Sequence, residues 1–166
     1  MLMSDDYYFE FEKEIGKYAD GVHELNGGCP VEAIDELEKK LELKLPDEYR
    51  LFLQIHNGGE LFIPGTELLT IQTAEKGEQC ISYLDEALEM LWPGMPEHFL
   101  IVAVLCYGDF VCLDLNNQSD GKCRAIKWDH ELGEISGEWS SFKEWLADEL
   151  SLGSEMRDYD GVHKDL

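Results

Sequence analysis

The sequence has little positive charge for its size. Of its 166 residues, 13 are Lys or Arg and 36 are Asp or Glu, so the formal net charge at pH 7 is −23. Nucleic acid and anionic membranes would bring further negative charge into this field, so we expect neither as a partner. A basic protein is favoured instead, because opposite charge speeds association.

Signals for secretion, membrane insertion and cross-linked scaffolds are also missing. The first residues carry acids where a secretory signal would carry Lys or Arg, and the longest apolar run, residues 99–107, is far shorter than the ~20 residues of a membrane helix. The 5 cysteines are odd in number and form no Cys-x-x-Cys pair, which indicates reduced and mostly buried thiols. We therefore expect a cytoplasmic protein without disulfides, structural metal or cofactor.

Motifs of phosphate-binding enzymes and serine hydrolases are absent as well. The chain has no Gly-x-Gly-x-x-Gly or Walker sequence, and the serine of residues 133–137 stands one place too late for a Gly-x-Ser-x-Gly motif. The histidines match no metal-binding spacing. Nucleotide chemistry and serine hydrolysis are therefore not expected.

Carboxylates in the second half of the chain leave two catalytic alternatives open. Asp109 and Asp114 could act as a general acid–base pair. Asp129, His130 and Glu131 could hold a metal if a turn bent them round, since neighbours on a strand point to opposite faces. Turn formation and hydrogen bonding are the simpler interpretations, because a carboxylate in an apolar strand needs a partner.

The apolar residues predict one α+β domain. Helical spacing predicts helices over about residues 5–25 and 81–92 and two more that begin at Pro30 and Pro46, while Ser141 and Glu144 form a capping box for a last helix. Short strands are predicted at residues 61–63 and 68–71, and an antiparallel meander at 99–106, 110–115 and 123–129, with a polar loop over 116–122. We expect a mainly antiparallel sheet with helices packed on it, with residues 1–28 as a helical extension, 29–152 as the domain and 153–166 as a polar tail.

Acidic residues are concentrated near the end of this pattern. Residues 129–149 contain 7 Asp or Glu and a single Lys. Such an excess on a small domain carries a cost in self-repulsion, and it would speed association with a basic partner. The charge pattern therefore favours binding to a basic protein.

Several ordered pieces of the sequence together resemble a known family. They are Ile34-x-x-x-Glu38, Leu45-Pro46-x-x-Tyr49-x-x-Phe52-Leu53-x-x-x-Asn57-Gly58-Gly59, Gly108-Asp109, Leu113-Asp114-Leu115, Ile126-x-Trp128-Asp129-His130 and Phe142-x-x-Trp145-Leu146. Their order and spacing are similar to those of the SUKH superfamily, the family of the Smi/Knr cell-wall-assembly regulators. The resemblance covers about residues 30–150.

This resemblance implies an α+β domain of the SUKH type without catalytic activity. Most bacterial members resemble immunity proteins, which bind and neutralise a cognate polymorphic toxin, often a nuclease, in the cytoplasm of the cell that makes it. A nuclease surface is basic because it binds phosphate, so an acidic protein can cover it. The candidate contact residues on the helix start, turns and loops are Asp47, Glu48, Glu60, Asp109, Asp129, Glu131 and Glu134. We expect a monomer or a weak dimer.

Two other functions remain open at this point. A regulatory or scaffolding domain that binds no toxin would have the same fold, as eukaryotic-type relatives do. A carboxylate-dependent metal hydrolase would have to bring together Asp109, Asp114, Asp129 and His130.

Overall fold

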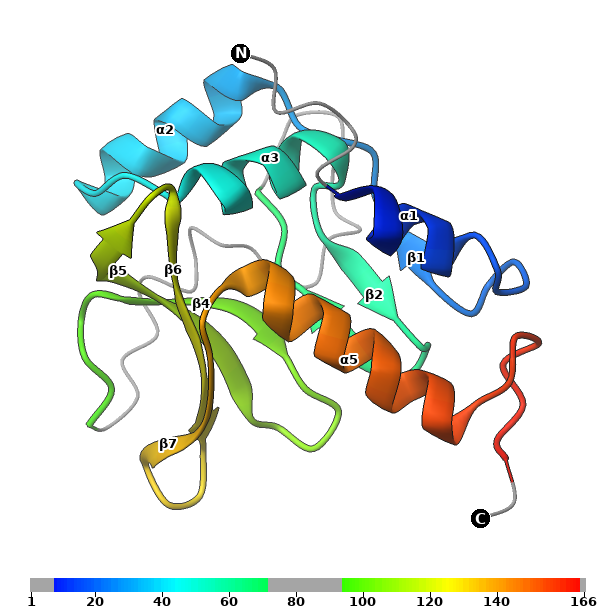
Figure 1. Cartoon of the computed structure of the whole chain (residues 1–166). Coiled ribbons are helices and arrows are strands. Elements are labelled where there is room, and N and C mark those ends of the chain that lie inside the picture. The colour runs from blue at the N-terminus through cyan, green and yellow to red at the C-terminus, as the bar shows by residue number, and fades with distance from the viewer. Residues whose placement is uncertain (1–7, 72–93, 165–166) are drawn as a thin grey trace.

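Neighbouring segments of the chain pair in sequence order to build one antiparallel sheet, on which the helices lie (Figure 1). The computed structural model describes residues 8–71 and 94–164. The strands are β1 (Glu24–Leu25), β2 (Gly59–Leu61), β3 (Thr66–Leu68), β4 (Phe99–Val104), β5 (Phe110–Ser119), β6 (Lys122–Asp129) and β7 (Glu134–Trp139), and the helices are α1 (Phe9–Ile15), α2 (Val31–Leu41), α3 (Asp47–Ile55) and α5 (Phe142–Met156). The predicted α+β fold with a mainly antiparallel sheet is confirmed. The helix predicted over residues 81–92 lies outside the described residues.

The middle strands form the centre of the core. Residues 110–113 of β5 are all buried, although neighbours on a strand point to opposite faces, so both faces of the sheet are covered here. The hydroxyl of Thr66 on β3 donates a hydrogen bond to the Glu149 carboxylate of α5 at 2.6 Å. Helix α5 therefore covers the face of the sheet that carries Thr66 (Figure 1).

The start of α5 is fixed from two sides. The side chain of Ser141 accepts a hydrogen bond from the backbone N–H of Glu144 at 3.2 Å, which confirms the N-cap half of the predicted capping box. The backbone N–H of Lys143 donates to Glu48 on α3 at 2.7 Å. A carboxylate at this position accepts a backbone N–H of the first helical turn and complements the helix dipole.

No helix in the described ranges is long and apolar enough to cross a membrane.

The N-terminal part differs from the single helix predicted over residues 5–25. Helix α1 ends at Ile15, and Glu24–Leu25 form a strand that pairs with β2. Tyr18 and Val22, which follow the helical spacing, reach the core from a loop instead. The helical spacing of these residues therefore predicted correctly that their side chains reach the core. It predicted the wrong backbone conformation, because a loop can place apolar side chains at the same intervals.

Two further differences concern the second half of the chain. The predicted polar loop 116–122 is a continuation of β5 and β6, and it turns at Asp120 and Gly121, which both have positive φ. Strand β7 was not predicted, because its residues are all exposed or half-buried and give no apolar alternation. Beyond α5, the backbone of Arg157 forms an isolated bridge with that of His163.

Candidate functional site

The family-like motifs within residues 34–59 have structural roles. Glu38 on α2 is 6% exposed, and its carboxylate accepts hydrogen bonds from the backbone N–H of Leu45 and from Arg50, both at 2.7 Å. These partners compensate the cost of burying the charge. They also tie the end of α2 to the start of α3.

Asn57 has an equally structural role. Its side chain is buried and both accepts from and donates to the backbone of Ile71, each at 2.8 Å. The next residue, Gly58, has φ 74°, and a Cβ there would stand 2.5 Å from the carbonyl oxygen of Leu69. Only glycine fits this position. The Asn-Gly-Gly sequence therefore joins α3 to the sheet and is not a free binding surface.

Two turns at one end of the sheet bring four of the predicted contact residues together. The turn before β5 carries Asp109, and the turn between β6 and β7 carries Glu131 and is flanked by Asp129 and Glu134, the paired end residues of the two strands. His130 joins the two turns, because its backbone N–H and its ring Nδ1 lie 3.1 and 2.6 Å from the same oxygen of Asp109. A Cβ on Gly108 would stand 3.1 Å from the His130 ring, so the first turn packs directly against it.

Electrostatics strengthen this link between the turns. Burial alone would raise the pKa of the Asp109 carboxyl, but the hydrogen bonds from His130 outweigh burial and lower it. The bond to Asp109 in turn raises the pKa of His130. Each group thus favours the charged form of the other, and the ion pair holds both turns in place.

The second turn is also built around a carboxylate. One oxygen of Asp129 accepts the backbone N–H groups of Glu131 and Leu132 at 2.9 and 2.8 Å. This is ordinary turn chemistry for Asp. It leaves Glu131, Leu132 and Glu134 pointing outward as exposed side chains.

Three exposed apolar side chains lie in or next to these turns. Tyr107 is 56% exposed, Leu132 70% and Ile135 41%. Lys127 Nζ lies 5.8 Å from the centre of the Tyr107 ring. We refer to Tyr107, Glu131, Leu132 and Glu134 together as the turn surface; Ile135 pairs with Trp128 and therefore faces the other side of the sheet from Lys127 and Tyr107. Large apolar side chains surrounded by charge are typical of protein-binding sites.

These three apolar residues were not among the predicted contacts. Their signal in the sequence was present but weak: Tyr107 stands in a Tyr-Gly-Asp turn, and Leu132 precedes Gly133. A large apolar residue inside a turn is hard to bury. Sequence periodicity finds core residues and does not mark such positions.

The other three predicted contact residues lie elsewhere. Asp47 is exposed and packs beside Gly121, at the opposite end of the β5–β6 hairpin from the turn surface. Glu48 is 2% exposed, so its carboxylate is no surface group. Glu60 lies on β2 and accepts the backbone N–H of Gly65 at 3.0 Å. The structure thus gathers four of the seven residues and separates the rest.

Asp114 is held in an ion-pair cluster on β5. It is fully buried, and one of its oxygens accepts hydrogen bonds from Arg124 and Asn117, both at 2.9 Å. The other oxygen lies 3.1 Å from Nε2 of His98, which is ion-pair distance without hydrogen-bond geometry. The predicted hydrogen-bonding role of Asp114 is therefore confirmed.

The residues required by the metal-hydrolase alternative do not converge. Asp114 follows Asp109 by five positions of extended chain, a span of roughly 16 Å. Asp109 is engaged with His130, and Asp129 is engaged in its own turn. Within the two described ranges, no three His, Cys, Asp or Glu side chains are grouped so that they could hold a metal ion.

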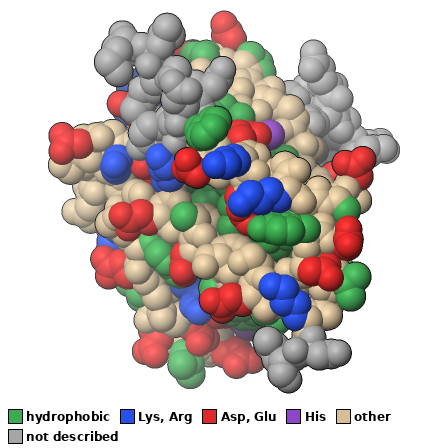
Figure 2. All heavy atoms as spheres, turned by 45° about the vertical axis from the view of Figure 1, so that its right-hand side comes forward, with side chains coloured by type: hydrophobic (Ala, Val, Ile, Leu, Met, Phe, Trp, Pro, Cys, Tyr) green, Lys and Arg blue, Asp and Glu red, His purple; other side chains and the backbone are tan. Residues whose placement is uncertain are grey.

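Acidic side chains are widespread beyond the turn surface. Figure 2 shows the face on the side of α1, where Asp and Glu are spread over the visible surface with Lys and Arg among them. The negative charge on this face is therefore a broad field and not one compact patch.

Comparison with known proteins gives two findings. A family model described as SMI1 / KNR4 family (SUKH-1) matches residues 28–148. The crystal structure of a protein from Pseudomonas syringae pv. tomato is similar with a TM-score of 0.61 and 17% sequence identity, and the match covers 84% of this chain and 96% of that one. At this identity the second finding shows the fold alone.

Proposed function

Because the chain belongs to the SMI1/KNR4 family (SUKH-1), we propose that it is a non-catalytic immunity protein that binds and neutralises a basic polymorphic toxin. The toxin we expect is a nuclease in the same cytoplasm. The observation that carries this proposal is the turn surface, where exposed apolar and acidic side chains are held by the ion pair of Asp109 and His130 on a domain of net charge −23.

The turn surface has the two components that such an interface requires. Tyr107 and Leu132 supply apolar area that can be buried against a partner. Glu131 and Glu134 supply charge at the rim, which speeds encounter with a basic surface. Because the link between Asp109 and His130 fixes the two turns beforehand, little conformational entropy is lost on binding.

Co-expression with the toxin encoded beside this gene tests the proposal. We expect the wild-type chain to restore growth and the double variant Glu131→Lys/Glu134→Lys to restore it poorly. The matched control is Glu32→Lys/Glu36→Lys, which makes the same change of net charge on two exposed residues of α2 and should rescue like the wild type. Normal killing in the presence of the wild-type protein would refute the immunity role.

The salt dependence of binding provides a second measurement. Screening shortens the range of the acidic field, so association with the toxin should slow as the salt concentration rises. The dissociation rate should change much less, because it depends on the apolar contacts of the turn surface.

A regulatory scaffold would use the same turn surface for different partners. Pull-down from the native cell separates the two functions. One basic, nuclease-like partner would support immunity, while several signalling or cell-wall proteins would support a scaffold.

A further inference from the structure

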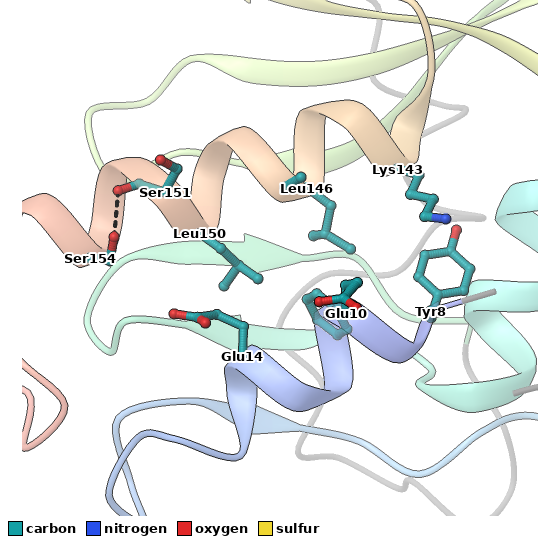
Figure 3. A pocket seen from close by; sticks show the side chains of 10 residues that line it. Tyr8, Glu10, Glu14, Lys143, Leu146, Leu150, Ser151 and Ser154 are labelled. Atoms are coloured by element: carbon teal, nitrogen blue, oxygen red, sulfur yellow. Dashed lines mark hydrogen bonds between the residues drawn. The ribbon is translucent and has the colours of Figure 1, made fainter. Parts of the chain in front are cut away.

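A groove runs between α1 and α5, on a part of the molecule that the turn surface does not include (Figure 3). Its volume is about 320 Å³. Phe11, Leu146 and Leu150, which are 7%, 1% and 5% exposed, form its apolar floor, and Glu10 and Glu14 stand on the α1 side. The groove therefore combines apolar contact area with negative charge.

The α1 wall of the groove is anchored in the core. Tyr8, just before α1, donates a hydrogen bond to the carbonyl oxygen of Glu48 at 2.8 Å. Phe11 is buried, and its ring lies edge-on to Phe52 of α3 with 5.9 Å between the centroids. The short α1 is thus held in position by tertiary contacts, and the groove exists before any ligand arrives.

The shape of the groove suits a helix. The α5 residues Lys143, Ala147, Ser151 and Ser154 recur at steps of four and three, so they lie along one face of α5. They span about 16 Å, which is close to three turns of a helix. Ala147 and Ser151 are exposed and short, which lets a second helix approach α5 closely.

The charge of the groove indicates what kind of helix it accepts. The side chain of Glu10 is exposed, and the carboxylate of Glu14 forms an ion pair with Lys17 at 3.0 Å. Lys143 lies at the end of the groove opposite Glu14, where its Nζ is 5.9 Å from the centre of the Tyr8 ring. A second copy of this chain would bring a net charge of −23 into the groove, so a basic segment is the better occupant.

We infer that the groove binds an amphipathic, basic helix of the protein partner. Apolar side chains of that helix would pack on Ala147 and on the accessible edges of the floor residues, and its Lys or Arg side chains would reach Glu10 and Glu14. The inference rests on the proposed function, because the helix is assigned to the same basic toxin. Glu10, Glu14, Leu150, Ser151 and Ser154 lie outside residues 28–148, so the family match covers only part of this groove.

A defined peptide tests binding to the groove. The probe is a synthetic peptide of about 14 residues with Leu at positions i, i+3, i+4 and i+7 and Lys elsewhere, and fluorescence anisotropy measures its affinity. Ala147→Trp fills the groove from an exposed position and should weaken binding by about tenfold or more. Glu10→Lys/Glu14→Lys should do the same, whereas Glu32→Lys/Glu36→Lys should have a much smaller effect.

Two comparisons decide the result. A scrambled peptide of the same composition should bind about tenfold more weakly, because it keeps the charge and loses the apolar face. Equal binding of both peptides, or unchanged binding to Ala147→Trp, would overturn the inference. If Ala147→Trp lowers the melting temperature, the charge-reversal pair supplies the same test without filling the groove.

Growth rescue separates this inference from the proposed function. Loss of both peptide binding and rescue in Ala147→Trp would support the groove as part of the toxin interface. Full rescue by a variant that no longer binds the peptide would overturn the inference and leave the immunity role intact. Failure of the wild-type chain to rescue would refute the proposed function, whatever the peptide does.

Discussion

The burial of His23 should make the fold lose stability in mild acid. Ring atom Nδ1 accepts the backbone N–H of Phe62 at 3.0 Å, so the proton of the neutral ring sits on Nε2. Within the described ranges, Nε2 is buried without a hydrogen-bond partner. The ring packs edge-on to Tyr18 and Phe62, with centroid distances of 4.7 and 4.5 Å. A second proton on this ring would break the bond from Phe62 and place a charge among aromatic rings.

Burial, followed by the nearby positive charge of Arg157, lowers the pKa of His23 from 6.5 to about 4. The unfolded chain therefore binds a proton in the window between these values while the folded chain does not. Stability from this group is complete above pH 6.5 and is lost as the pH falls toward 4. At about 1.4 kcal/mol for each pKa unit, the loss amounts to roughly 3 kcal/mol.

Urea denaturation between about pH 7.5 and 4.5 measures this loss. His23→Asn keeps an acceptor near the position of Nδ1 and cannot take up a proton, so its free energy of unfolding should fall less steeply than that of the wild type. His163→Asn, at an exposed position, is the control and should follow the wild-type curve. Parallel curves for wild type and His23→Asn would refute the reasoning, because the titration of carboxylates is common to both proteins.

Three further predictions concern buried polar groups. Glu48→Ala removes the acceptor for the N–H of Lys143 and should lower the free energy of unfolding, measured in urea at neutral pH, by about 1–3 kcal/mol. Glu48→Gln should retain most of the stability. Equal stability of both variants and the wild type would contradict this prediction. Asn57→Ala removes both hydrogen bonds to Ile71 and should cost about 2 kcal/mol or more by the same measurement, and a loss below about 0.5 kcal/mol would argue against the buried pairing. Burial raises the pKa of the Glu149 carboxyl, so its contribution to stability is present in acid and is lost as the pH rises. Glu149→Gln should therefore melt at a higher temperature than the wild type at pH 7, and the difference should shrink toward pH 4; a constant difference would contradict the assignment.

The sequence predicted those parts of the fold whose signals are local. The N-cap bond between Ser141 and Glu144 depends on residues three apart, and the strands around residues 99–129 are marked by their apolar content. Strand β7 was not predicted, because an exposed edge strand needs no alternation of apolar and polar residues. The helix expected up to residue 25 ended at Ile15, because core contacts made from a loop imitate helical spacing.

The candidate site also contains residues that local sequence signals identify and residues that they do not. Asp109, Asp129, Glu131 and Glu134 were selected as turn and loop residues, and the structure places them in two adjacent turns or at the strand ends beside them. Nothing near Glu48 in the sequence shows that its carboxylate caps a helix 95 residues further along the chain. Long-range hydrogen bonds of this kind decide whether an acid is buried or exposed.

The groove between α1 and α5 joins segments from opposite parts of the chain. Helix α1 leaves the ribosome early, but the wall that faces it is completed only with residues 143–154. A nascent chain therefore has no such groove to offer, because Leu146 and Leu150, which form part of its apolar floor, arrive only with α5. Any ligand that requires both walls can recognise only a chain whose synthesis has passed α5.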